Sequence, residues 1–169
     1  MKTPLRVMLT RLLLPIMALL SACDREGQPV QEVGLDRLSI GVSSESDVRT
    51  AMGKPETTWE DEDGTRILEY PKAPEGSRTW IFSIDPQGKL VEYHQALTAE
   101  NFARVTAGTS RDAVRRLLGK PRTVVKFALS KEEVWDYRYL DQHQGRLFNV
   151  HFDQASGKVL RTSTSEVAY

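Results

Sequence analysis

The sequence predicts an α+β fold of two tandem repeats, each with short helices packed on an antiparallel sheet. Three observations predict this fold: the same motifs occur twice in the same order, each copy opens with a helical pattern, and each closes with alternating strands. We expect repeat 1 at residues 35–96 and repeat 2 at residues 97–169. The element order in each copy is α-α-β-β-β, with a fourth strand where the length allows it.

The internal repetition consists of collinear blocks. Gly53-Lys54-Pro55 recurs 66 residues later as Gly119-Lys120-Pro121. The other matched pairs are Ile67-Leu68-Glu69-Tyr70 with Val134-Trp135-Asp136-Tyr137, Ile84-Asp85 with Phe152-Asp153, and Gly88-Lys89-Leu90 with Gly157-Lys158-Val159. The spacing between matched blocks grows slowly along the chain, as insertions in loops would cause. The body of the protein therefore consists of two tandem copies of one structural unit.

Each copy contains a short helix with a start signal and a stop signal. Ser44 and Asp47 form a Ser-x-x-Asp start, and Thr109 or Ser110 provides the corresponding cap in the second copy. The apolar residues that share one helical face are Val48, Ala51 and Met52 in the first copy and Val114, Leu117 and Leu118 in the second. The expected left-handed stops are Gly53 and Gly119, each followed by a proline.

A further helix precedes each of these. Residues 98–105 predict one with Phe102 and Val105 facing inward, and residues 35–40 predict a shorter counterpart in the first copy. Gly41 and Gly108 would separate the two helices of each copy.

The remaining segments predict strands. They lie around residue 59 and at 67–70, 80–84 and 90–93 in the first copy, and at 122–129, 134–139 and 147–152 in the second. Alternation in the last of these buries Phe148, Val150 and Phe152, or else the opposite set. Hairpin loops are expected at 85–88 and 153–157. Because a copy of this size is marginally stable alone, we expect the two to share a core or a continuous sheet.

Residues 1–22 resemble a lipoprotein signal peptide. Basic residues precede an apolar run at 12–20, which is shorter than the roughly 20 residues that span a membrane. Leu20-Ser21-Ala22-Cys23 then resembles a bacterial lipobox, which implies cleavage between Ala22 and Cys23 and acylation of Cys23 with lipid such as palmitate. The alternative is an ordinary secretion signal cleaved elsewhere, with Cys23 as a free thiol. Several acyl chains on one residue would make the anchor effectively permanent.

The segment that follows predicts a tether. Residues 23–34 comprise the acylated cysteine and a polar stretch that we interpret as flexible. Asp24, next to the modified cysteine, resembles an inner-membrane retention signal. The sequence therefore leaves open which membrane holds the protein.

Composition excludes several classes of protein. The 23 basic and 23 acidic residues balance, so nothing in the charge predicts nucleic-acid binding. The single cysteine excludes an internal disulfide and a cysteine-rich zinc site. A mean hydropathy of −0.41 excludes a protein with many membrane-spanning helices.

A family resemblance follows from these motifs. The helix that ends in Gly-Lys-Pro, followed by an aromatic strand such as Trp135-Asp136-Tyr137, resembles the SmpA/OmlA (BamE-like) lipoproteins, here in two tandem copies. That family includes an outer membrane protein assembly factor, so the resemblance implies a lipid-anchored protein facing the periplasm, with the outer membrane favoured. The tandem arrangement is also similar to the fold of β-lactamase inhibitor protein.

The sequence predicts no catalytic residue, no metal site and no bound cofactor. A metal site built from His143 and His151 with Asp141 or Asp153 is the alternative to loop and sheet-face histidines. Ser43, Ser44 and Ser110 are interpreted as helix caps because no nucleophile-elbow motif surrounds them. The residues given structural roles are His94, the acidic run 60–63 as a solvated turn instead of a calcium loop, and Arg115 and Arg116 as the solvent face of a helix.

The three tryptophans are further candidates for a core or a binding role. Trp59, Trp80 and Trp135 are assigned to the core, with the alternative that one lies on an open sheet face as a binding anchor. Lys54 and Lys120 follow glycine but lack the rest of a phosphate-binding loop.

The functional hypothesis is a lipid-anchored, non-catalytic protein-binding module of the cell envelope. Its expected partners are membrane lipid, through acylated Cys23, and envelope proteins that include outer membrane assembly components, with no nucleic acid. One alternative is an inhibitor or modulator that wraps a periplasmic enzyme with a concave two-repeat sheet. Another is a hydrolase or metal enzyme, which requires His143, His151 and Asp153 in one pocket.

Overall fold

The computed structural model describes residues 34–72, 76–142 and 144–167. The signal peptide, Ala22, Cys23, the tether up to residue 33, and His143 lie outside the described residues. Among the described residues, no helix combines the length and the apolar character needed to cross a membrane.

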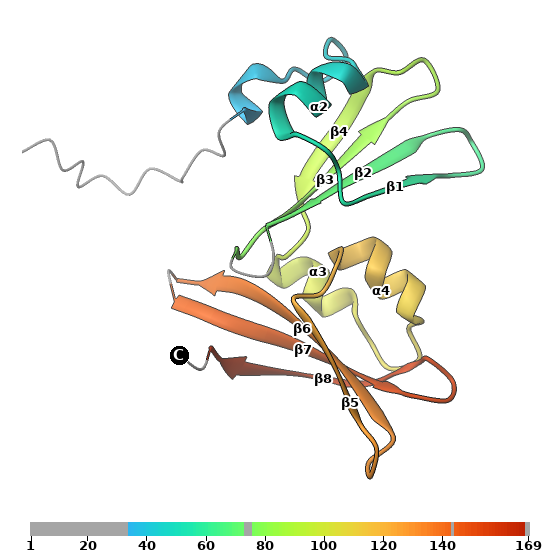
Figure 1. The fold of residues 1–169 in the computed structure, drawn as a ribbon, viewed down its shortest axis with the longest axis vertical. Helices are drawn as coiled ribbons and strands as arrows, with labels where there is room; N and C mark the ends of the chain where they lie inside the picture. Colours follow the sequence, from blue (N-terminus) through green and yellow to red (C-terminus); the bar gives the residue numbers. More distant parts are fainter. Residues whose placement is uncertain (1–33, 73–75, 143, 168–169) are drawn as a thin grey trace, which may run out of the picture. The chain divides into compact units, whose positions relative to one another are not determined.

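The first repeat contains short helices followed by a four-stranded antiparallel sheet with strand order β1-β2-β3-β4 (Figure 1). Its elements are the 3-10 helix η2 (Leu35–Arg37), α2 (Glu45–Met52), β1 (Thr57–Glu60), β2 (Arg66–Pro71), β3 (Thr79–Ile84) and β4 (Leu90–Gln95). The short helix predicted at residues 35–40 is thus a single 3-10 turn.

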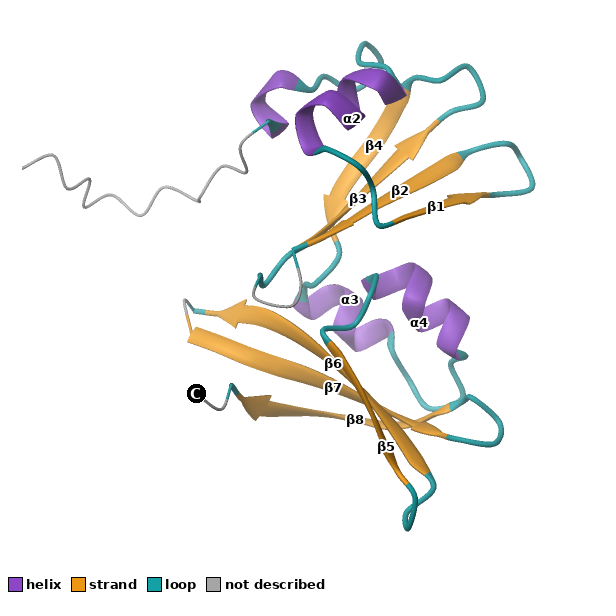
Figure 2. Ribbon diagram, in the orientation of Figure 1, coloured by secondary structure: helices purple, strands orange, loops and turns teal. Residues whose placement is uncertain are grey.

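The second repeat follows the same order (Figure 2). Its elements are α3 (Ala99–Arg104), α4 (Arg111–Leu118), β5 (Thr123–Phe127), β6 (Glu132–Asp141), β7 (Gln144–Asp153) and β8 (Val159–Glu166). The strands again form an antiparallel sheet, in the order β5-β6-β7-β8. The predicted α+β class with two tandem units is confirmed, and each copy has the fourth strand.

The helix caps predicted at Ser44 and Ser110 are present, whereas the prediction for Ser43 is wrong, because its buried hydroxyl accepts a hydrogen bond from the Ser39 amide at 2.9 Å. The Ser44 side chain accepts a hydrogen bond from the Asp47 amide at 3.2 Å, and the Asp47 carboxylate accepts one from the Ser44 amide at 2.8 Å, which completes a capping box. The hydrogen bond from the Ser44 amide lowers the pKa of Asp47. In the second copy Ser110, and not Thr109, is the N-cap of α4.

The two helices end at glycines, as predicted, but not in the left-handed helical conformation. Gly53 has φ 86° and ψ −157°, and Gly119 has φ 81° and ψ −163°. This region of backbone space is accessible essentially to glycine alone. It turns the chain sharply from the helix into the first strand of each sheet, β1 or β5.

Each repeat has a hydrophobic core of its own. In repeat 1 the α2 residue Val48 packs against the sheet, and in repeat 2 Val114 and Leu118 of α4 do the same. The expectation of a shared core or a continuous sheet is wrong, because the helices of each copy cover one face of that copy's own sheet. Of the two alternatives for β7, the buried set is Phe148, Val150 and Phe152.

The capping box provides a stability test. Ser44→Ala removes the acceptor of the Asp47 amide, so we expect the free energy of unfolding to fall by about 1 kcal/mol. Ser46→Ala, an exposed change in the same helix, should alter it by less than about 0.5 kcal/mol. Urea denaturation of both variants measures the difference. Equal stability of the two variants would show that the cap contributes nothing.

Candidate functional site

The outer face of each sheet, opposite the helices, carries an acidic side chain at the same position. In β2 this residue is Glu69, which pairs with Thr57 of β1, and in β6 it is Asp136, which pairs with Thr123 of β5. The two faces are therefore built alike. Their surroundings differ, because the first is occupied by part of repeat 2.

The Glu69 side chain is completely buried by residues of the second repeat. It forms an ion pair with the Arg115 guanidinium of α4, and its Oε1 accepts a hydrogen bond from the Lys120 amide at 2.7 Å. Arg115 also donates to Thr57 Oγ1 at 3.3 Å and lies 5.3 Å from the centre of the Trp59 ring. We call this contact, formed by these five residues, the internal joint. It lies within one compact unit, residues 33–169.

Two further ion pairs, both more exposed than the pair of Glu69 with Arg115, border the internal joint. Arg116 pairs with Asp61, and the Lys120 ammonium pairs with Glu56. The hydrogen bond from Lys120 lowers the pKa of Glu56. The interpretation of Arg115 as part of a solvent face is therefore wrong, because its side chain packs against the outer face of the first sheet. Arg116 is exposed, as expected of a solvent face, and it also pairs with Asp61 of repeat 1.

The equivalent face of the second sheet is open. It holds a recess of about 270 Å³ whose lining residues are Val125, Phe127, Val134, Asp136, Leu147, Asn149, His151, Ser163 and Ser165. Phe127 is 49% exposed and Val125 is 42% exposed. The Asp136 carboxylate accepts a hydrogen bond from the Thr123 hydroxyl at 2.6 Å. We call this surface the open face.

A chain of hydrogen bonds crosses the open face. His151 Nδ1 lies 2.9 Å from Glu132 Oε2, and its Nε2 lies 3.1 Å from Ser163 Oγ, in the order of a nucleophilic triad. Arg161 also binds that Glu132 oxygen at 2.9 Å, and the Asn149 amide donates to Ser163 at 3.3 Å. Ser163 lies inside the regular strand β8, whereas a triad serine sits on a sharp turn beside oxyanion donors. These hydrogen bonds link β6, β7 and β8.

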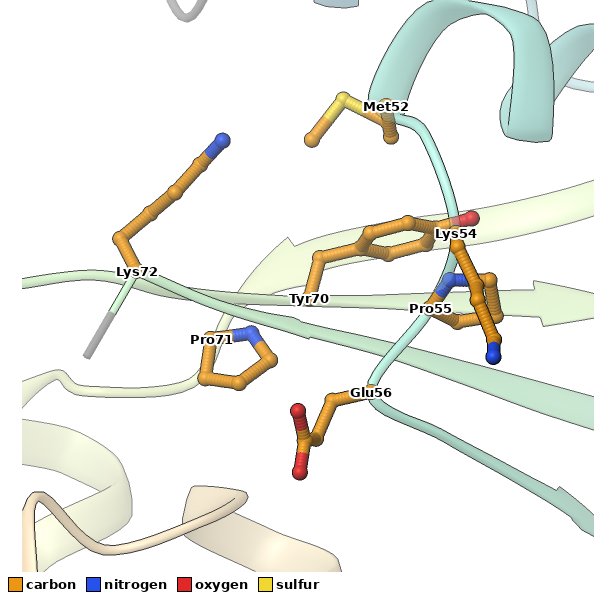
Figure 3. Close-up of a pocket in the computed structure, with 7 residues that line it drawn as sticks. All are labelled: Met52, Lys54, Pro55, Glu56, Tyr70, Pro71 and Lys72. Carbon is orange, nitrogen blue, oxygen red and sulfur yellow. The ribbon is translucent and has the colours of Figure 1, made fainter. Parts of the chain in front are cut away.

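A second recess lies in repeat 1, beside the turn that ends α2. It has a volume of about 330 Å³ and is lined by Met52, Lys54, Pro55, Glu56, Tyr70, Pro71 and Lys72 (Figure 3). The Tyr70 hydroxyl donates to the Gly53 carbonyl at 3.1 Å, as Tyr137 does to Gly119 at 3.2 Å. In repeat 2 the amide of the corresponding turn, that of Lys120, donates a hydrogen bond to Glu69.

The other predicted candidates take structural positions. Asp153 Oδ1 accepts from the Ser156 amide and hydroxyl in the β7–β8 loop, both at 2.7 Å, so it does not join His151 in a pocket. His94 is half-exposed beside Glu92. Across residues 34–72, 76–142 and 144–167, no cluster of metal-ligating side chains is found.

The residues of the acidic run 60–63 do not all have the same role, and neither do the three tryptophans. Asp63 accepts from the Thr65 amide in the β1–β2 turn, whereas Asp61 pairs with Arg116. Trp80 and Trp135 pack against the cores of their repeats. Trp59 lies on the outer face under Arg115, so the alternative of a sheet-face anchor applies to this residue.

The internal joint could not be predicted from local sequence patterns. Glu69 and Arg115 are 46 residues apart, so no local spacing connects them. One signal was available. Glu69 stands between Leu68 and Tyr70 in a predicted strand, and an acidic residue buried among such neighbours requires a cation from elsewhere.

The second repeat is similar to a known family of protein domains. Residues 95–160 match the family model of the outer membrane protein assembly factor BamE domain. The second repeat is BamE-like, as its motifs predicted. The matched region contains α3, α4 and the strands of the second sheet up to the start of β8. No curated protein matches the chain.

Three solved structures are similar to parts of this chain. One, described as the osmotically inducible lipoprotein OsmE, is 26% identical, covers 42% of this chain and 75% of its own, and has a TM-score of 0.37. The DUF4309 family protein YjgB from Bacillus subtilis is 19% identical, with 77% and 82% covered and a TM-score of 0.30. A structure described as a β-lactamase inhibitor protein from Streptococcus mutans is 12% identical, with 81% and 91% covered and a TM-score of 0.33.

The internal joint provides a second stability test. Glu69→Ala leaves Arg115 and the Lys120 amide without their acceptor, so we expect the free energy of unfolding to fall by about 3 kcal/mol. The control Glu62→Ala changes an exposed carboxylate in the β1–β2 turn and should cost less than about 0.5 kcal/mol. Chemical denaturation of both variants measures this difference. A Glu69→Ala variant as stable as the control would refute the joint.

Proposed function

We propose that this protein is a lipid-anchored, non-catalytic binding module of the cell envelope that uses the open face to hold another envelope protein. The main support for this proposal is the contrast between the two equivalent sheet faces. One face is occupied by an arginine and a helix end, and the other presents a carboxylate and exposed apolar side chains to solvent. The match of residues 95–160 to a domain named for outer membrane protein assembly supports an assembly role.

The composition of the open face suits protein binding. Phe127 and Val125 supply exposed apolar area, and a polar network at Asn149, His151 and Ser163 borders it. An apolar centre with a polar rim is the usual arrangement of a protein interface. Such a face can hold a partner without any reacting group.

The repeat boundaries belong to the same proposal. We assign residues 35–96 to the first copy and residues 97–169 to the second, joined between β4 and the Thr98 cap of α3. The two copies have different roles. The first copy binds α4 of the second copy, and the second copy binds the partner protein.

The anchor is a separate part of the proposal. We infer that cleavage between Ala22 and Cys23 is followed by acylation of Cys23, and that residues 24–33 act as the tether that carries the repeats. The outer membrane is favoured by the family, and Asp24 is the residue that would hold the protein in the inner membrane instead.

Cys23→Ser tests the anchor. The variant should lose the mass of the acyl chains and leave the membrane fraction, because a single signal segment without lipid gives no lasting attachment. Mass spectrometry and fractionation of inner and outer membranes measure both effects. An unmodified thiol on a freely diffusing wild-type protein would overturn the anchor. Asp24→Ser should move the protein toward the outer membrane if residue 24 retains it.

Phe127→Asp tests the open face. The full chain, cross-linked in the membrane and purified, should recover envelope proteins, and the variant should recover at least tenfold less because a charge replaces the apolar centre of the face. Leu129→Asp is the matched control, since Leu129 is fully exposed next to β5 but outside the recess. Quantitative mass spectrometry of the recovered proteins measures the ratio.

Two results would contradict this proposal. Recovery of no envelope protein above background by the wild-type chain would remove the binding role. Equal loss with Phe127→Asp and Leu129→Asp would remove the open face as the binding surface.

A further inference from the structure

We propose that the free edge of β5 accepts an extended segment of the partner protein as an added strand, with an acidic side chain opposite Lys126 and apolar side chains opposite its neighbours. This inference rests on the proposed function, because β5 borders the open face and the added strand would extend that face. It specifies how the partner docks and which side chains it presents.

Strand β5 is an edge strand of the second sheet (Figure 1). In the part of the chain that the structure describes, β5 pairs with β6 alone. An edge strand presents amide and carbonyl groups on its free side, and these can form hydrogen bonds with another extended chain. Addition of a strand to such an edge is a common mode of peptide recognition, in which the alternating side chains provide the specificity.

The edges formed by β4 and β8 are partly covered by their own repeats. Residues 41–43 form backbone hydrogen bonds with Leu90 at the start of β4, and residues 108–109 do the same with Val159 at the start of β8. The rest of β8 carries only serines and threonines at positions 162–165. An apolar strand therefore has less to gain at β8 than at β5.

The edge strand of the first repeat, β1, is protected by charge and by repeat 2. Trp59 lies under Arg115, and Asp61, which follows the strand, pairs with Arg116. At the repeat offset of 66 residues, Thr58, Trp59, Glu60 and Asp61 are replaced by Val124, Val125, Lys126 and Phe127. Charged side chains are a usual protection of sheet edges, and Lys126 is the one charged residue of β5.

Apolar side chains of β5 are exposed on both faces of the sheet. Val125 and Phe127 lie on the outer face, where they line the recess of the open face. Val124 pairs with Trp135 of the core, so it lies on the face that the helices cover, and it is 50% exposed. The side chains of an added strand would lie about 5 Å from those of β5. Apolar residues of the partner would therefore cover β5 on both faces.

The acidic residue of the partner follows from Lys126. The Lys126 ammonium lies 3.7 Å from Glu133 Oε2, and Glu133 Oε1 accepts hydrogen bonds from Arg111 at 3.0 Å and from the Trp135 indole at 2.8 Å. Two cations therefore share the Glu133 carboxylate, and the Lys126 side chain stays 69% exposed. An acidic side chain across the free edge would give Lys126 a second carboxylate.

Strand β6 already presents this order of side chains on the other side of β5. Lys126, Val125 and Val124 lie opposite Glu133, Val134 and Trp135. Along its own direction, β6 thus offers an acidic residue followed by two apolar ones. We expect the same order in an antiparallel partner strand, with one more apolar residue before it to lie opposite Phe127.

The β5 edge is less suited to a second copy of itself. Antiparallel pairing of two β5 strands about Val125 would place Lys126 opposite Val124, and parallel pairing in register would place two Lys126 side chains next to each other. Neither arrangement supplies a carboxylate. A lysine in an edge strand disfavours self-association, so Lys126 selects an acidic partner over an identical chain.

Linear peptides test the added strand. The first has the sequence of residues 132–138 with Glu132→Leu, and two further versions are N-methylated at positions 133 and 135 or at positions 134 and 136. The amides of a paired strand point alternately toward its neighbour and toward solvent. One methylated version should therefore bind roughly tenfold more weakly than the other. Binding to the full chain in detergent micelles is measured by fluorescence anisotropy.

Exchange of the charge tests the acidic residue. A fourth peptide carries Glu133→Lys as well as Glu132→Leu, and the wild-type chain should prefer the first peptide to it by about threefold. Lys126→Glu should reverse this preference, and Lys126→Gln should abolish it. Lys131→Gln is the matched control, since Lys131 is exposed in the turn after β5, and it should leave the preference unchanged. A folding defect would weaken both peptides alike and could not reverse their order.

Failure of the added strand is separable from failure of the proposed function. Equal affinities of the two methylated peptides overturn the inference, as do a charge preference that Lys126→Glu leaves unchanged and the absence of binding at about 1 mM peptide. If cross-linked envelope proteins still depend on Phe127, the proposed function stands while this inference falls. If no envelope protein is recovered but the peptides behave as expected, the inference stands and the envelope assignment falls.

Discussion

A buried carboxylate organises the contact between the repeats. Burial of Glu69 without partners would cost several kcal/mol, so its ion pair with Arg115 and its hydrogen bond from the Lys120 amide have to form together. Both partners come from the end of α4, one from the last turn and one from the backbone just beyond it. The position of repeat 2 against the first sheet therefore depends on where that helix stops.

The helix stops at Gly119, and the structure explains why. A positive φ combined with an extended ψ directs the Lys120 amide toward Glu69, and the same turn returns the chain into β5. The local signals of a short helix thus determine a contact between elements that are distant in the sequence. Folding of α4 and formation of the internal joint are consequently coupled.

Duplication has left two similar scaffolds with different surfaces. The residues that shape the turns and cores are retained: both copies have a tyrosine that donates to the terminal glycine carbonyl, and both have a serine cap. The residues of the outer faces have diverged, with Asp61 against Phe127 and Glu56 against Arg122. The two sheets are separate, and α4 covers part of the first.

The sequence was sufficient where the determining interactions are local. The cap at Ser44 and Asp47, the buried alternation of Phe148, Val150 and Phe152, and the hairpin loops follow from spacing alone. It was insufficient where the determining contact is distant, as for Glu69 with Arg115, because helical periodicity places Arg115 outside the core without showing what lies there. The shared core was mispredicted for the same reason: an ionic contact joins the copies where apolar burial was expected.

The glycines at 53 and 119 occupy the same place in the repeated motif but are not equally replaceable. A side-chain carbon at Gly53 would meet no atom within 4 Å, so only the backbone conformation restricts that position. At Gly119 the same carbon would lie 2.6 Å from Thr79 Cγ2 and 3.1 Å from Glu69 Oε1. Substitution of Gly53 would therefore cost backbone strain alone, because its conformation is accessible essentially to glycine, whereas any substituent at Gly119 would also have to displace Thr79 and Glu69 of the first repeat.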